Sequence, residues 1–96
     1  MFTIGVATIE LHLPGNGSLK GKRAIVRPIV TRLRNEFNVS VAEVAAQDAY
    51  QRAVLAITCV NADANYVHTL LMKVVDAVER MRIDAEIVDY EIELIQ

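Results

Sequence analysis

The stretch Asn38–Asn61, "NVSVAEVAAQDAYQRAVLAITCVN", decides the fold of this chain. Two apolar runs, about Asn38–Ala46 and Tyr50–Asn61, flank the short polar segment "QDAY". Runs rich in β-branched residues around such a segment predict two strands joined as a β-hairpin. We expect the hairpin to turn at Asp48 and Ala49.

Alternate residues of this hairpin divide between the two faces of a sheet. One predicted face holds the larger aliphatic side chains, and we expect it to contact the helices: Ala42, Val44, Leu55, Ile57 and Cys59. The other predicted face is turned outward: Val39, Val41, Val54, Ala56 and Thr58. Exposed apolar surface of this kind usually marks an interface, so we expect a homodimer through this sheet face or its edge.

Helical segments lie on both sides of the hairpin. Ser18 is a natural N-cap for a first helix that runs to about Glu36, and Asp63 caps a second helix. Pro28 removes one backbone donor and predicts a kink or an irregular first turn. Apolar residues recur at helical spacing in both segments. They are Leu19, Val26, Ile29, Val30, Leu33 and Phe37, then Val67, Leu70, Leu71, Val74, Val78 and Met81.

Strand-like segments, about Phe2–Leu13 and Glu86–Ile95, complete the chain. The last one alternates cleanly, with Val88, Tyr90, Ile92 and Leu94 on one face and Asp89, Glu91 and Glu93 on the other. The order β-α-β-β-α-β predicts an α+β, ferredoxin-like sandwich, in which two helices cover one face of an antiparallel four-stranded sheet. Residues 1–96 form a single domain in this prediction.

Composition agrees with one globular domain, because 53% of the 96 residues are hydrophobic and 23% are charged. The N-terminal "MFTIGVATIELHLP" has no basic region before its apolar run, so it is typical of a strand and not of a signal peptide. No apolar segment approaches membrane-spanning length. The single Cys59 cannot form an internal disulfide. We expect a cytoplasmic protein without membrane contact.

The net charge of −2 conceals a strong asymmetry along the chain. Ser18–Asn35 holds six basic residues and no acidic one, whereas Asp76–Glu93 holds seven acidic residues against Arg80 and Arg82. At about 100° per residue, four basic side chains fall within a sector of about 60° on the first helix. We call the basic surface of this helix the cationic ridge, and its predicted members are Lys20, Arg23, Arg27 and Arg34.

The loop before this helix contains Gly15, Gly17 and Ser18, and we expect it to bind an anion at the helix N-terminus. A Walker-type phosphate loop is excluded, because five residues separate Gly15 from Gly21 and Arg23 stands where the hydroxyl belongs.

Other chemistry finds little support in the residue pattern. Acylphosphatases share this topology, but Arg23 and Asn61 do not lie in the motif of that family. His12, His68 and Cys59 are not clustered as metal ligands or as a nucleophile with its base. We therefore predict no catalytic residues, no metal and no cofactor.

The hairpin turn is expected to be structural. Glu43 and Arg52 fall on the same sheet face at diagonal positions in the predicted register, which favours an ion pair between them. Gln47, Asp48 and Gln51 surround the turn.

Several motifs resemble those of the small bacterial YlxP-like family, a domain-of-unknown-function group. They are "ELHLPGNGSLKGKR", "RLRNEFNVSVAEV" and "QDAYQRAVLAI", in the same order. Gly21 and Pro28 depart from the family pattern. The resemblance implies a ferredoxin-like fold and a cytoplasmic protein often encoded among translation genes, with no established activity. The family's distinctive polar positions here are Ser18, Lys20, Lys22, Arg23, Glu43, Gln47, Asp48, Gln51 and Arg52.

The resulting hypothesis is a non-enzymatic binding module that docks on structured RNA, plausibly ribosomal, through its first helix. The residues assigned to RNA are Lys20, Lys22, Arg23, Arg27 and Arg34. RNA read by shape and charge is favoured, because the nearest aromatic residue, Tyr50, stands at a strand end. Three alternatives stay open: a merely solvated helix face, a homo-oligomer whose ridge meets acidic partners, and a loop at Gly15–Arg23 that binds a small phosphorylated molecule.

Overall fold

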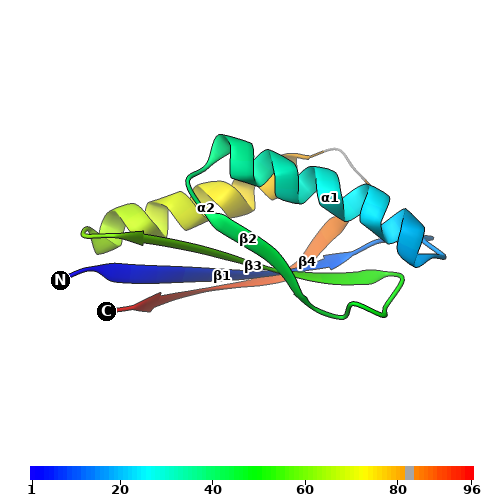
Figure 1. Cartoon of the computed structure of the whole chain (residues 1–96), viewed down its shortest axis with the longest axis horizontal. Helices are drawn as coiled ribbons and strands as arrows, with labels where there is room; N and C mark the ends of the chain where they lie inside the picture. Colours follow the sequence, from blue (N-terminus) through cyan, green and yellow to red (C-terminus); the bar gives the residue numbers. More distant parts are fainter. Residues whose placement is uncertain (82–83) are drawn as a thin grey trace.

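The computed structural model describes residues 1–81 and 84–96 and has the predicted element order. The elements are β1 (Thr3–His12), α1 (Leu19–Glu36), β2 (Ser40–Ala45), β3 (Arg52–Asn61), α2 (Ala64–Arg80) and β4 (Glu86–Ile95). The antiparallel sheet has the strand order β2-β3-β1-β4. Both helices lie on one face of it, so the ferredoxin-like α+β prediction is confirmed (Figure 1).

Side-chain caps begin both helices as expected. The Ser18 hydroxyl accepts a hydrogen bond from Gly21 N at 2.9 Å, and the Asp63 carboxylate accepts from Asn65 N and Tyr66 N. The first helix continues from Leu19 to Glu36 with Pro28 inside it. The proline therefore removes one donor without dividing the helix.

The core lies between the helix layer and the sheet. Gly5 in β1 allows a close approach of α2, since a Cβ at this position would lie 2.3 Å from Val67 Cγ1 and 2.7 Å from Leu71 Cδ1. The largest fully buried side chains come from every layer of this core: Ile9, Leu11, Leu13, Ile29, Leu33, Leu55, Ile57, Val67, Leu71 and Val74.

The predicted faces of β2 are wrong. Val41 pairs with Ile57 and is buried on the helix side, while Ala42 pairs with Ala56 and is exposed. The register of the two strands shifts between Glu43 and Ala45, which is a β-bulge. A displacement of one residue turns every side chain of a strand to the other face. Consequently Val39 and Val41 face the helices, and Ala42 does not.

A second bulge alters β4. Glu10 pairs with Asp89 and Leu11 pairs with Ile87, so Val88 has no direct partner in β1 and is 53% exposed. The remaining expected faces of β4 agree with the register. Three carboxylates therefore lie on the open face of the sheet, opposite the helices: Asp89, Glu91 and Glu93.

Candidate nucleic-acid interface

Three predicted members of the cationic ridge lie exposed on one face of α1. Lys20, Arg23 and Arg27 surround a shallow groove of about 320 Å³, whose floor includes Ala24 and Pro28. Pro28 has no N–H, so the Ala24 carbonyl lacks its usual intrahelical donor. The groove thus combines three long cations with the small, exposed residues Ala24 and Pro28.

These three cations differ from Arg32 and Arg34 on the same helix. Lys20, Arg23 and Arg27 form no ion pair within residues 1–81 and 84–96. Arg32, by contrast, pairs with Glu36 at 2.8 Å. The Arg34 guanidinium donates to the carbonyl of Val41 at 2.7 Å, so it caps the outer edge of β2 and is partly used by the fold.

Lys22 does not belong to the ridge, which corrects the sequence-based assignment. Its side chain is only 3% exposed, and its ammonium donates to the carbonyls of Ala46, Ala49 and Arg52 at 2.6, 3.0 and 3.0 Å. The Glu43 carboxylate lies 2.8 Å from the same nitrogen. At about 100° per residue, Lys22 points well away from the ridge sector. It fastens α1 to the β2–β3 hairpin.

The backbone of this hairpin loop is fixed from several directions. Ala46 has a φ of 60°, which is uncommon for a residue with a Cβ. Its carbonyl accepts both from Lys22 and from Ala49 N, at 2.6 and 3.0 Å. Leu13 N donates to the carbonyl of Gln51. The side chains of Gln47, Asp48, Tyr50 and Gln51 are nevertheless exposed, so a hydrogen-bonded loop presents them to solvent.

The predicted anion-binding loop is organised by Asn16, a residue that the pattern analysis missed. Its amide donates to the carbonyls of Ser18 and Tyr50 and so ties the loop to the hairpin. Gly15 has a φ of 73°, a conformation that glycine adopts without strain. Since Ser18 already accepts from Gly21 N, part of the helix N-terminus is satisfied internally. An Asn between two glycines is a turn signal that pointed to this role.

Glu43 and Arg52 do not pair with each other, contrary to the sequence-based expectation. Because β2 is turned over relative to the predicted register, Glu43 faces Lys22 under the helices. Arg52 pairs instead with Glu10 on β1, at 2.8 Å. This hydrogen-bonded guanidinium holds the pKa of Glu10 below its ordinary value, and Glu10 in turn raises the pKa of Arg52.

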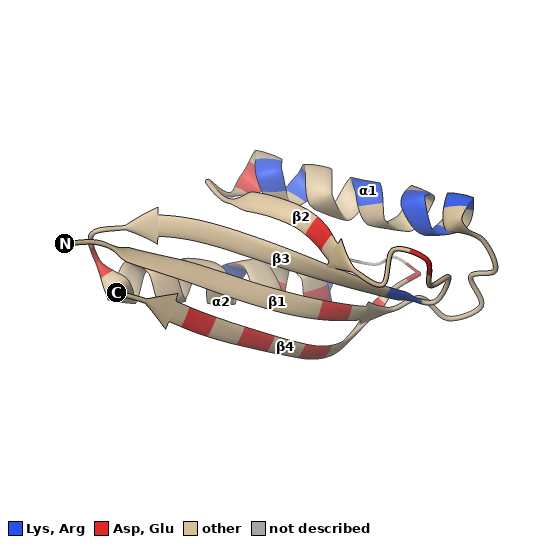
Figure 2. Cartoon of the chain, turned by 60° about the horizontal axis from the view of Figure 1, so that its bottom comes forward, with Lys and Arg blue, Asp and Glu red and all other residues tan. Residues whose placement is uncertain are grey.

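Figure 2 shows basic residues concentrated on α1 and acidic residues recurring along β4. The register places the β4 carboxylates Asp89, Glu91 and Glu93 on the open face of the sheet. An anionic ligand would therefore meet attraction at α1 and repulsion at β4.

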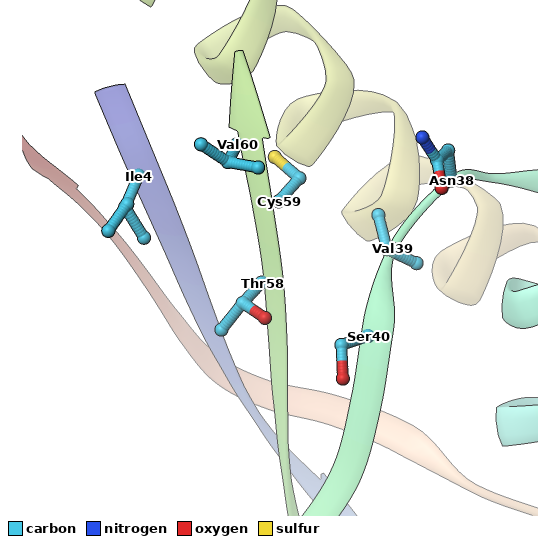
Figure 3. A pocket seen from close by; sticks show the side chains of 7 residues that line it. All are labelled: Ile4, Asn38, Val39, Ser40, Thr58, Cys59 and Val60. Atoms are coloured by element: carbon cyan, nitrogen blue, oxygen red, sulfur yellow. The ribbon is translucent and has the colours of Figure 1, made fainter. Parts of the chain in front are cut away.

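A separate hollow of about 530 Å³ lies where β2 and β3 diverge, with Ile4, Val39, Thr58 and Val60 in its walls (Figure 3). The half-buried Cys59 also lines it, and burial raises the pKa of this thiol, which disfavours the reactive thiolate. Among the described residues no group of three potential ligands is placed to hold a metal ion. No helix in that part of the chain is long and apolar enough to cross a membrane.

Comparison with known proteins identifies the family of this chain. The family model described as "Protein of unknown function (DUF503)" matches residues 4–92. The chain is also 45% identical over 58 residues to a Bacillus subtilis (strain 168) protein described as "Uncharacterized protein YlxP". That match covers 60% of this chain and 63% of the relative, which is less than two thirds of the relative's length. The extent of the family match shows that this chain is a member of the DUF503 family.

Proposed function

We propose that the protein is a non-enzymatic, cytoplasmic module that binds structured RNA, with ribosomal RNA as the first candidate. The observation that carries this proposal is the groove on α1 lined by Lys20, Arg23 and Arg27, three exposed cations without an acidic partner in the described part of the chain. Lys20, Arg23 and Arg27 thus form the exposed, unpaired part of the predicted cationic ridge within the described residues, and the name is kept for these three.

The ridge suits phosphates better than it suits a small ligand. Its side chains are long, exposed and spread over two turns of helix, so they reach successive phosphates of a nucleic-acid backbone. Contacts of this type give affinity and salt dependence without reading the base sequence. At physiological salt, two exposed charges more than about 8 Å apart interact only weakly. The overall charge of −2 therefore matters less to a ligand bound at the ridge than the cations that it contacts.

Charge reversal tests the proposal. Binding of a labelled ribosomal RNA fragment is measured for the native protein and for Arg23→Glu/Arg27→Glu. The matched control is Lys73→Glu/Arg80→Glu on α2, which changes the net charge equally. We expect the ridge variant to lose binding while its unfolding curve stays close to that of the native protein. Equal binding by the two variants contradicts the proposal.

A homodimer through the open sheet face is a second candidate, favoured by one row of side chains. Ile4 lies opposite Val60 on one side and Ile95 on the other, and these residues are 36%, 62% and 48% exposed. Apolar side chains that are continuous across three strands are typical of a protein interface. Light scattering on the native protein and on Ile4→Glu tests this candidate. A mass of one chain for the native protein contradicts it.

A further inference from the structure

The hairpin loop beside the ridge carries an aromatic side chain that the proposed function does not use. Tyr50 is 51% exposed. Its hydroxyl makes no hydrogen bond to any residue of the ranges 1–81 and 84–96. About half of the surface of Tyr50 is therefore accessible to a ligand that approaches this end of the molecule.

The backbone around Tyr50 is tied by hydrogen bonds to other parts of the chain. Its own carbonyl accepts from the Asn16 amide, and the carbonyls of the residues on either side, Ala49 and Gln51, accept from Lys22 and Leu13 N. Three consecutive carbonyls are thus fixed by three other parts of the chain. The backbone of this loop therefore loses little conformational freedom when a ligand binds to it.

The ridge and Tyr50 lie at the same end of the molecule and on connected segments. Lys22 stands next to Arg23 in α1, and its ammonium contacts the loop directly. Figure 1 shows the start of α1 and the β2–β3 loop together at one end of the sandwich.

The ridge and the β2–β3 loop differ in charge, so they suit different parts of an RNA ligand. The ridge holds three cations and attracts phosphates, whereas the loop holds Asp48, whose carboxylate repels them. The exposed amides of Gln47 and Gln51 add hydrogen-bond donors and acceptors to the same loop. A nucleobase is uncharged and has a stacking face and hydrogen-bonding edges, so it fits the loop where a phosphate does not.

We infer that Tyr50 is a stacking platform for one unpaired nucleotide, and that the RNA ligand is a stem interrupted by a bulge or loop, not a continuous duplex. This inference rests on the proposed function, because the ridge must hold the phosphates of the same RNA. The sequence alone favoured recognition of RNA by shape and charge. In the inferred site, phosphate contacts at the ridge are combined with one base stacked on Tyr50.

The test compares two RNAs that differ in one nucleotide: a continuous stem, and the same stem with one unpaired adenosine. Each is titrated with the native protein, Tyr50→Ala, Tyr50→Phe and Tyr66→Ala. Tyr66 on α2 is the matched control, since it is an equally exposed tyrosine at 53%. We expect the native protein, Tyr50→Phe and Tyr66→Ala to bind the interrupted stem about tenfold more tightly than the continuous one.

Tyr50→Ala should bind both RNAs with the affinity of the native protein for the continuous stem. Equal affinity of the native protein for the two stems overturns the stacking inference but leaves the RNA-binding proposal in place. Loss of affinity for both stems in Tyr50→Ala also overturns it, since the residue would then act through the loop's structure. Failure of the native protein to bind either RNA overturns the proposed function together with the inference.

Discussion

Lys22 Nζ lies 2.8 Å from Glu43 Oε2, and this contact joins the start of α1 to the β2–β3 hairpin. All three ammonium protons are donated to backbone carbonyls, so the Glu43 oxygen balances the charge without accepting a hydrogen bond within the described part of the chain. The pair makes Lys22 a structural lysine, in contrast to the exposed ridge of Lys20, Arg23 and Arg27 on the same helix.

Replacement of Lys22 by Met should destabilise the fold by about 3 kcal/mol, because it leaves the Glu43 carboxylate partly buried and unpaired. Three loop carbonyls also lose their donor. Urea denaturation measures the change. Lys20→Met, two residues away and exposed, is the control and should shift the unfolding free energy by less than about 0.5 kcal/mol. Similar stability of the two variants would contradict the structural role of Lys22.

Gly21→Ala should destabilise the protein despite the higher helix propensity of alanine. A Cβ at this position would lie 2.2 Å from Asn16 Oδ1 and 3.0 Å from Ser18 Oγ. Displacing Asn16 breaks its two hydrogen bonds, at about 1 kcal/mol each, against a propensity gain of about 1 kcal/mol. In an Asn16→Ala background the same substitution should be stabilising. A double-mutant cycle measured by thermal unfolding checks this, and additive effects would refute the contact.

Gly5→Ala should lower the unfolding free energy by about 1–3 kcal/mol, because the added methyl group enters the space of Val67 and Leu71. Gly17→Ala is the matched control, since nothing lies within 4 Å of the Cβ that it adds. Chemical denaturation of both variants decides the point. If the two variants have equal stability, α2 does not pack on β1 in the way described.

The Glu10–Arg52 pair predicts a dependence of stability on pH. The pKa of Glu10 is lowered in the folded protein, first by the hydrogen bond from Arg52. A lowered pKa contributes stability above the ordinary value of 4.5, and this contribution is lost as the pH falls through the folded value.

Glu10→Gln should therefore be less stable than the native protein at neutral pH, and the difference should shrink as the pH falls below 4.5. Urea denaturation over a pH series measures it, and Arg52→Gln should show the same profile. A difference that does not change with pH would exclude the ion pair as its cause.

The element order and both helix starts were predictable from local residues. Ser18 and Asp63 cap their helices through contacts within three residues, so the sequence alone contains the signal. The face of β2 was not predictable in the same way. Its orientation depends on a bulge between Glu43 and Ala45, and no local pattern reveals where an extra residue enters a strand.

Only the part of the candidate site that depends on local geometry was predictable from the sequence. Helical spacing placed Lys20, Arg23 and Arg27 on one exposed face, because that geometry depends on α1 alone. The family motif at the start of this helix, by contrast, led to the wrong placement of Lys22. The acceptors of Lys22 lie on the hairpin, far away in the sequence. Long-range partners decide whether a basic side chain is free.

Salt dependence of RNA binding tests the central claim most directly. Affinity for a structured ribosomal RNA fragment is measured over a salt series for the native protein and for Lys20→Ala, Arg23→Ala and Arg27→Ala, with Arg32→Ala as the control that already pairs with Glu36. We predict that each ridge variant reduces the slope of log affinity against log salt by about 0.7–0.9, and that Arg32→Ala leaves it nearly unchanged. Absence of binding at low salt, or equal slopes for all variants, would contradict RNA binding through the ridge.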